Sequence, residues 1–322
     1  MKNKIFLFAL LCTSSFCFGN LFRLFGNKEE RNKAMQEIIQ QVVTPEAQPV
    51  EQAAPVQPSI ARQGNPLSTQ LDLVSAVQMA EFSALAYQNP ESIQAALSSK
   101  GFHQWRFFSA PRTDGQAYVA WNNSYGILAF RGTEPDSWKD FLTDARFKLV
   151  TWNGKGRVHR GFAESFEELW SESGLGRFMH ADAQRPWIIV GHSMGAGLAT
   201  LAASRFPGTY SLYTFGSPRT GNREFAQSIT RPVFRFVNQS DPVVDVPPYV
   251  RGLDIFDHCG QLYQITPDMK IENSRTPNIL STRMSLGALL GGGFNGAEWQ
   301  QALQKGIQEH MPQAYLNALQ SL

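Results

Sequence analysis

The stretch Trp187-Ile188-Ile189-Val190-Gly191-His192-Ser193-Met194-Gly195-Ala196-Gly197-Leu198-Ala199-Thr200 determines how the rest of the chain is interpreted. Its apolar, β-branched first part is typical of a buried parallel strand, and its small residues from Gly195 onward are compatible with a helix. Ser193 is therefore predicted to lie on a tight turn between strand and helix. Glycines at 191 and 195 let the two elements approach closely, and the turn holds the serine in a strained backbone conformation that exposes its hydroxyl above the sheet. This context favours a nucleophile over an incidental loop serine.

The length and charge of the chain limit the classes of protein to consider. Its 322 residues are enough for one large α/β domain or two small ones. The net charge is +2, and because acidic and basic residues are mixed, no basic stripe favours a nucleic-acid partner. We expect a single folded domain over residues 68–322, because the first fifth of the chain does not have the composition of a folded unit.

Residues 1–19 have the pattern of an export signal. A short basic start precedes an apolar run, residues 5–11, which is too short to span a bilayer. We predict cleavage near residue 19 and export to the periplasm, the outer surface or the medium. Lipid attachment at Cys12 or Cys17 is the alternative, which the bulky residues before them disfavour. If both leave with the signal, Cys259 is the only cysteine of the mature chain, and an internal disulfide is excluded.

Residues 20–67 are predicted to be an extension or linker. The first part is charged with a weak helical pattern, and residues 44–66 are rich in proline, glutamine and alanine. Such a composition buries little apolar surface and stays extended. An arm that packs along the domain is the alternative.

From residue 68 the chain alternates between helical and strand patterns. Helices are expected over residues 71–87, 91–99, 163–170 and 222–229. Strands are expected over residues 103–109, 117–121, 125–130, 187–191, 212–219, 232–238 and 261–265. The succession predicts an α/β fold with a mostly parallel, right-handedly connected central sheet flanked by helices. His159 precedes the serine at a helix entry, so we interpret it as a structural histidine.

A short amphipathic helix is expected just after the third strand. Pro135 lies near its start, and Trp138, Phe141 and Leu142 follow at the spacing of one apolar helix face. We interpret it as a lid over the cleft; a surface helix docked permanently on the core is the alternative. The glycine-rich segment 284–297 has three alternative interpretations: a flexible loop beside the cleft, an acyl-chain surface or an internal packing turn.

Six short motifs follow one another along the chain. They are Phe130-Arg131-Gly132-Thr133, the Trp138 segment, Val158-His159-Arg160-Gly161-Phe162, Gly191-His192-Ser193-Met194-Gly195, Thr214-Phe215-Gly216-Ser217-Pro218-Arg219 and Asp241-Pro242-Val243. Their order is that of class 3 (fungal-type) lipases, a family of α/β-hydrolases, which the chain resembles over about residues 68–322. The resemblance implies serine ester hydrolysis on lipid-like substrates, with a lid that opens at an interface.

The chemistry of a serine nucleophile requires two partners further along the chain. A histidine must take the hydroxyl proton, and a carboxylate must orient that histidine. In this fold the order is Ser, Asp, His. Asp241 directly follows the 232–238 strand and matches the family motif. Asp245 is its competitor, and Asp254 and Asp257 are weaker candidates.

Two histidines follow Asp241. His310 begins a segment that resembles the family's C-terminal catalytic histidine and the short helix after it, whereas His258 resembles a structural histidine of the family. Pro312 departs slightly from that pattern, but a first helical turn tolerates proline. The predicted catalytic residues are therefore Ser193, Asp241 and His310.

The oxyanion of the intermediate needs backbone donors that are already in place. In this fold they are the N–H after the serine and one from the earlier strand–helix loop, which correspond to Met194 and Thr133. The Thr133 hydroxyl either adds a second bond or holds the loop. The histidines are scattered and the acidic residues lack the spacing of oxygen ligands, so neither a metal nor another cofactor is expected.

The sequence thus predicts a secreted lipase that acts on acylglycerols through an acyl-enzyme. A phospholipase or lipid acyltransferase is the nearest alternative, because the lid and pocket, rather than the catalytic residues, decide head group and acceptor. A non-catalytic binding module with the same fold is the alternative from another class. The expected partners are a lipid or ester substrate and, transiently, a lipid interface; acyl-chain length and oligomeric state stay open.

Overall fold

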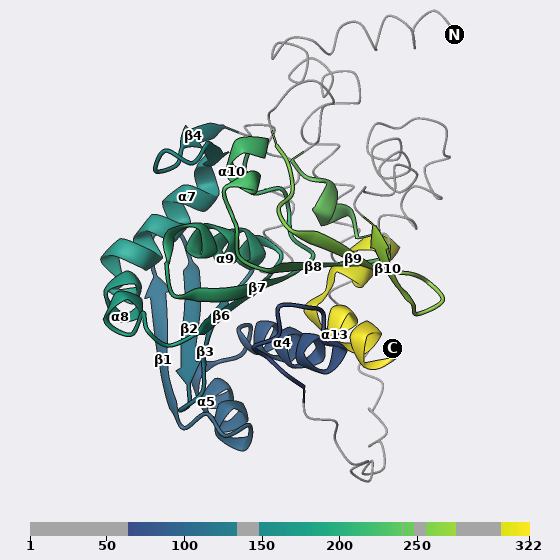
Figure 1. Ribbon diagram of the computed structural model, residues 1–322, viewed down its shortest axis with the longest axis horizontal. Coiled ribbons are helices and arrows are strands. Elements are labelled where there is room, and N and C mark those ends of the chain that lie inside the picture. The colour runs from purple at the N-terminus through teal and green to yellow at the C-terminus, as the bar shows by residue number, and fades with distance from the viewer. Residues whose placement is uncertain (1–63, 134–147, 240, 248–255, 275–303) are drawn as a thin grey trace, which may run out of the picture. The chain divides into compact units, whose positions relative to one another are not determined.

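The central feature of the fold is one eight-stranded mixed sheet (Figure 1). A computed structural model of the chain describes residues 64–133, 148–239, 241–247, 256–274 and 304–322. In the sheet the strands stand in the order β1-β2-β3-β6-β7-β8-β9-β10. Their bounds are β1 Gln104–Ala110, β2 Gly115–Trp121, β3 Gly126–Phe130, β6 Trp187–His192, β7 Thr209–Phe215, β8 Val233–Asn238, β9 Gln261–Ile265 and β10 Ile271–Ser274.

The five strands from β3 to β9 run parallel, and the strands at both edges are antiparallel to their neighbours. This confirms the mostly parallel sheet. The carboxyl ends of β6 and β8 therefore lie at the same edge of the sheet, the edge where ligands bind in α/β folds. A second, two-stranded sheet pairs β4, Leu149–Thr151, with β5, Arg157–His159.

Helices cover the sheet. The sequence predicted the bounds of the first helices more closely than the bounds of those in the middle of the chain. They are α4 Leu73–Leu85, α5 Pro90–Ser99, α7 Arg160–Glu167, the π-helix η2 Glu168–Glu172, α8 Leu175–Ala181, α9 Met194–Arg205, α10 Arg223–Gln227, the 3-10 helix η3 Pro242–Asp245 and α13 Pro312–Gln320. Residues 304–310 are also helical. Helices of this length depend on packing for most of their stability.

Polar side chains and proline fix several helix starts. Asp72 caps α4 by accepting a hydrogen bond from the N–H of Val74, and Asn89 caps α5 with Pro90 in the first turn. Pro312 likewise stands in the first turn of α13, as expected from the sequence. His159 precedes α7, where its Nδ1 accepts a hydrogen bond from the N–H of Phe162 at 3.4 Å, which confirms its structural role.

The two ends of the described chain meet. α4, dark blue in Figure 1, packs against α13, in yellow, and both contact the central sheet. Their apolar side chains, Tyr315 of α13 included, share one buried cluster with alternate residues of the strands, among them Tyr118, Val190 and Phe236. α9 packs on β3, β6 and β7, and α7 packs on α9. The C-terminal helix is thereby held close to the strand ends that carry the candidate site.

Several elements differ from the sequence-based expectations. α7 starts at Arg160 rather than at 163, because His159 supplies its cap, and the helix continues as a π-helix. β7 starts at Thr209, where a register shift against β6 keeps the chain paired. β10 and α8 were not predicted from the sequence. β10 is a polar edge strand, and the glycines at 174 and 176 weaken the helical pattern of the short α8. No helix in the described ranges has the length and apolarity needed to cross a membrane.

Several expectations concern residues outside the described ranges. These are the export signal over 1–19, the extension up to residue 63, the lid residues Trp138, Phe141 and Leu142, and the glycine-rich segment 284–297. All described residues belong to one compact unit.

Candidate active site

Ser193 has the strained turn geometry that the sequence predicts. It stands between the last residue of β6 and the first residue of α9, with φ 57° and ψ −132°. A positive φ is costly for a residue with a Cβ and persists only where the surroundings impose it. Here the N–H of Ser193 donates to the carbonyl of Phe215 at 3.0 Å, which fixes the turn against β7. The side chain is nearly buried, with 3% relative exposure.

The glycines on both sides of the serine are required by close approach. A Cβ on Gly191 would overlap the backbone of Gly195, and a Cβ on Gly195 would overlap the carbonyl of Phe130 at the end of β3. The helix therefore starts directly against two neighbouring strands. This contact is the structural reason for the Gly-x-Ser-x-Gly spacing.

Asp241 and His310 lie in direct contact although 69 residues separate them. Nδ1 of His310 donates to Oδ2 of Asp241 at 2.7 Å, and both side chains are buried. The carboxylate also accepts hydrogen bonds from the Tyr315 hydroxyl at 2.6 Å and from the N–H of Val243 at 2.8 Å. A carboxylate on Nδ1 keeps that nitrogen protonated, so the lone pair of a neutral His310 is on Nε2, the nitrogen a general base needs.

Tyr315 is held as a hydrogen-bond donor. Burial, and then the charge of Asp241 and the bond to it, raise the pKa of the Tyr315 hydroxyl well above its usual value. The hydroxyl oxygen in turn accepts a hydrogen bond from the N–H of Asn238 at 3.0 Å. Tyr315 thus connects α13 to the end of β8 and to the carboxylate. From the sequence, Tyr315 was expected only as a member of the helix after His310.

Gly216 lies beneath the Asp241–His310 pair. Its φ is +58°, and a Cβ there would stand 2.8 Å from Oδ2 of Asp241 and 2.9 Å from Nδ1 of His310. Both the backbone angle and the space therefore demand glycine at this position. Gly216 belongs to the motif over residues 214–219, so this close approach explains why that motif contains a glycine.

His192 ties three segments of the site together. Its ring centroid lies 4.6 Å from that of His310. Its Nε2 lies 2.6 Å from the backbone carbonyl oxygen of His310, and its Nδ1 lies 2.7 Å from the hydroxyl of Tyr87. Burial, and then the neighbouring His310, lower the pKa of His192 well below its usual value, so the ring is neutral at neutral pH. A neutral ring has one donor; Nε2 must donate to the carbonyl, and Nδ1 accepts from Tyr87.

Tyr87 and His192 are not among the functional residues predicted from the sequence. His192 precedes the serine in the chain, which is the one signal that pointed to it. Nothing in the sequence linked it to Tyr87, which is 105 residues away and follows α4. This link depends on how α4 packs against β6.

The competing residues are engaged elsewhere. Asp245 pairs with the buried Arg219, with 3.6 Å between Oδ1 and Nη2. Nε2 of His258 lies 2.8 Å from the carbonyl oxygen of Val244, and burial, followed by the charges of two arginines, lowers its pKa well below the usual value. Oδ1 of Asp257 accepts a hydrogen bond from the N–H of His258. The structure therefore brings His310, not His258, to Asp241; Asp254 lies outside the described residues.

Thr133 and Met194 are brought together beside the serine. The Thr133 hydroxyl donates to the sulfur of Met194 at 3.0 Å. A Cβ on the preceding Gly132 would lie 3.1 Å from Cβ of Ser193, so the loop after β3 passes directly against the serine turn. The hydroxyl thus joins this loop to the start of α9. Both backbone N–H groups remain predicted oxyanion donors.

A strained serine between a parallel strand and a helix, with a buried Asp–His pair at the same edge of the sheet, defines an α/β-hydrolase. Residues 127–251 of the chain match the family described as lipase (class 3). The matched region contains Thr133, Ser193 and Asp241, whereas His310 lies beyond it.

Curated relatives and solved structures agree with this assignment. A secreted mono- and diacylglycerol lipase of Fusarium solani is 33% identical over 42% of this chain and 44% of its own length. One from Penicillium cyclopium is 33% identical over 50% of this chain and 55% of its own length. The structure resembles that of a Rhizomucor miehei triacylglyceride lipase with a TM-score of 0.52, at 25% identity, over 64% of this chain and 89% of that one. The chain spans about half the length of these two curated relatives.

Proposed function

We propose that the protein is an exported serine hydrolase that cleaves carboxylic esters of acylglycerols. The observation that carries the proposal is the contact between Asp241 and His310 beside the strained Ser193 turn. The names of the Fusarium and Penicillium relatives supply the substrate class and support export. In this proposal residues 1–19 are the export signal, 20–67 the extension and 68–322 the catalytic domain.

The proposed reaction follows from the roles of these groups. Oγ of Ser193 attacks the ester carbonyl while Nε2 of His310 takes its proton, and Asp241 holds the imidazole and stabilises its charged form. The N–H groups of Thr133 and Met194 stabilise the oxyanion. The proton then passes to the leaving alcohol, an acyl-enzyme forms on Ser193, and water activated by His310 hydrolyses it.

Labelling and turnover together test the catalytic assignment. A fluorophosphonate probe is expected to label the wild-type protein at Ser193, and Ser193→Ala is expected to lose both labelling and hydrolysis of short p-nitrophenyl esters with an unchanged melting temperature. Ser217→Ala, which alters a buried serine of the same fold, is the matched control and should retain labelling. Turnover by Ser193→Ala, or wild-type protein that the probe does not label, would exclude the mechanism.

The substrate class has a separate test. Purified protein offered mono-, di- and triacylglycerols and phosphatidylcholine in parallel is expected to release fatty acid from the acylglycerols. Preferential release from phosphatidylcholine, or transfer of the acyl group to added glycerol or cholesterol, would replace the lipase by a phospholipase or an acyltransferase while leaving the serine mechanism in place.

The proposed lid of Trp138, Phe141 and Leu142 predicts a response to interfaces. The rate should rise steeply when the substrate passes from monomers to micelles or an emulsion. Replacing all three residues by serine should remove this jump without removing turnover of monomeric esters. A smooth saturation curve across the transition in the wild type would make the protein a plain esterase.

A further inference from the structure

Two polar residues, Thr214 and Arg235, lie next to each other on the sheet face opposite the α4 and α13 cluster. Thr214 on β7, Arg235 on β8 and Leu262 on β9 are paired in register. Side chains alternate between the two faces along a strand, and Phe234 and Phe236 belong to the α4 and α13 cluster. Arg235 therefore projects to the other face, which α9 covers.

The guanidinium of Arg235 is buried, and no acidic side chain of the described residues forms a direct ion pair with it. Its exposure is 7%, and its Nε has no hydrogen-bond partner in the part of the chain that the structure describes. Its register neighbour on β9 is an apolar leucine, which offers no acceptor. Burial lowers the pKa of Arg235 to about 10, so the group still carries its charge at neutral pH. A buried cation without a direct counter-ion is costly for a fold.

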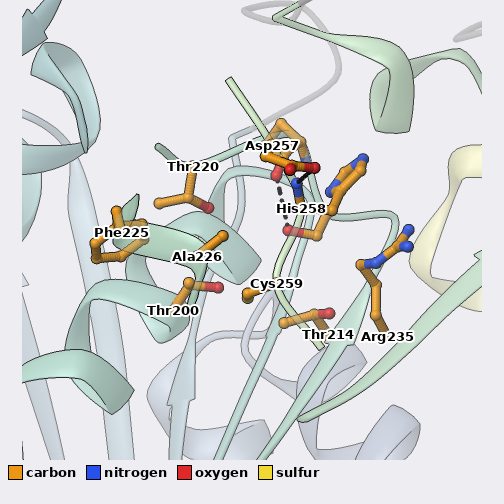
Figure 2. A pocket seen from close by; sticks show the side chains of 11 residues that line it. Thr200, Thr214, Thr220, Phe225, Ala226, Arg235, Asp257, His258 and Cys259 are labelled. Atoms are coloured by element: carbon orange, nitrogen blue, oxygen red, sulfur yellow. Dashed lines mark hydrogen bonds between the residues drawn. The ribbon is translucent and has the colours of Figure 1, made fainter. Parts of the chain in front are cut away.

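A small, partly open cavity lies beside this cation. It has a volume of about 10 Å³, and polar residues line it together with Pro218, Phe225 and Ala226; the polar ones include Arg235, Thr200, Thr214, Thr220 and Cys259 (Figure 2). The hydroxyl of Thr214 is also buried without a hydrogen-bond partner among the described residues. Figure 2 shows Thr214 and Arg235 as neighbours on adjacent strands, as the register requires. The cavity thus presents donors with no acceptor assigned to them.

The charged groups around the cavity do not supply that acceptor. Arg219 adds a second positive charge close enough to lower the pKa of Arg235 and of His258, and its own partner is Asp245. Asp257 also lines the cavity, and its charge acts to raise the pKa of Arg235, but its Oδ1 accepts from the backbone N–H of His258 and the two side chains form no direct ion pair. His258 is neutral, because its pKa lies well below the usual value.

We propose that this cavity is an anion site that holds one halide ion, bound by Arg235 and the hydroxyl of Thr214. The volume admits a single occupant of about the size of a water molecule, and among common anions only monatomic ions approach that size. The occupant neutralises the guanidinium beneath the end of β8, the strand that leads to Asp241. This site is independent of ester hydrolysis.

Thermal stability gives the first test. Wild-type protein dialysed into sodium gluconate and titrated with sodium chloride at constant ionic strength is expected to melt about 2–4 °C higher in chloride, and bromide should act like chloride. Equal melting temperatures in chloride, bromide and gluconate would overturn the proposal.

A substitution that introduces a carboxylate beside Arg235 gives the second test. Leu262→Glu places an acidic side chain in register with Arg235 and is expected to abolish the chloride-dependent shift. Gln261→Glu adds the same charge at an exposed position next to it on β9 and should keep the shift. A chloride response that survives in Leu262→Glu would contradict the site.

Anomalous diffraction from bromide tests the site in the wild-type protein, even if Leu262→Glu does not fold. Wild-type crystals grown in sodium bromide and measured at the bromine absorption edge should show an anomalous peak within hydrogen-bond distance of Arg235. An ordered water there, with no anomalous signal, would show that the cavity is hydrated and that the anion assignment is wrong.

Discussion

The hydroxyl of Tyr315 donates to Oδ2 of Asp241, the same oxygen that accepts the hydrogen bond from Nδ1 of His310. One carboxylate oxygen therefore orients the proposed base and is itself held by the C-terminal helix. Its other oxygen accepts from the N–H of Val243. Because a buried carboxylate needs all its donors, loss of one disturbs the position of the imidazole as well as the stability of the fold.

Tyr315→Phe should separate these two effects. Removing the hydroxyl leaves Oδ2 with one donor fewer and the N–H of Asn238 without its acceptor, so we expect a loss of about 1–3 kcal/mol in the free energy of unfolding and a kcat lower by about tenfold. KM should hardly change, because the tyrosine is buried behind the carboxylate. Urea unfolding and ester kinetics measure the two quantities.

The matched control is Tyr118→Phe. Its hydroxyl donates to the carbonyl of Phe82 at 2.7 Å and is likewise buried, but it lies away from the site. It should lose a similar amount of stability with an unchanged kcat. Equal kcat losses in both variants would show that Tyr315 acts only through stability.

Gly216→Ala is expected to reduce kcat by about 100-fold or more, because the methyl group displaces the Asp241–His310 pair. Gly101→Ala is the control, since Gly101 also has a positive φ, +80°, but a Cβ there meets nothing within 4 Å. Both variants carry backbone strain, and only the first has the overlap. Initial rates on a soluble ester, with melting temperatures, distinguish them; full activity in Gly216→Ala would contradict the assigned geometry.

Asp241→Asn should lower kcat by about 10⁴-fold, because an amide facing Nδ1 no longer enforces the tautomer that places the lone pair on Nε2. Asp245→Asn removes a carboxylate four residues away that pairs with Arg219 instead, so its kcat should stay near the wild-type value. Single-turnover ester hydrolysis measures both. A large loss confined to Asp245→Asn would reverse the assignment.

Buried neutral histidines predict a loss of stability in mild acid. Burial and the nearby arginines hold the pKa of His258 in the fold well below the usual histidine value of about 6.5, so below that pH the unfolded chain binds a proton that the folded chain does not. This contribution is fully present above about pH 6.5 and is lost as the pH falls. Melting temperatures from pH 8 to pH 5 should therefore decline.

His258→Gln should flatten that decline, because glutamine donates to the carbonyl of Val244 without titrating. His103→Gln, at an exposed position, should leave the decline unchanged and serves as the control. A slope that is identical in His258→Gln and the wild type would show that other groups govern the acid response.

Periodicity predicted the strands near the serine well, because a buried parallel strand must be continuously apolar. β6 and β8 have the predicted positions to within a residue, and Asp241 follows β8 as expected. The polar edge strand β10 and the short α8 escaped this reasoning, since neither carries a clear apolar period. Hydrophobic periodicity in a sequence reflects which side chains are buried, so an element that buries few side chains has no clear periodicity.

The sequence by itself determined the strand, the strained serine and the helix, because that turn depends on residues adjacent in the chain. It also named the acid and the base, through motif order. Only the tertiary structure shows that His310 is in contact with Asp241, that Tyr315 and His192 hold the pair, and that Arg235 lines a small cavity on the other face of the sheet. These relationships join residues that are far apart along the chain, and packing alone fixes them.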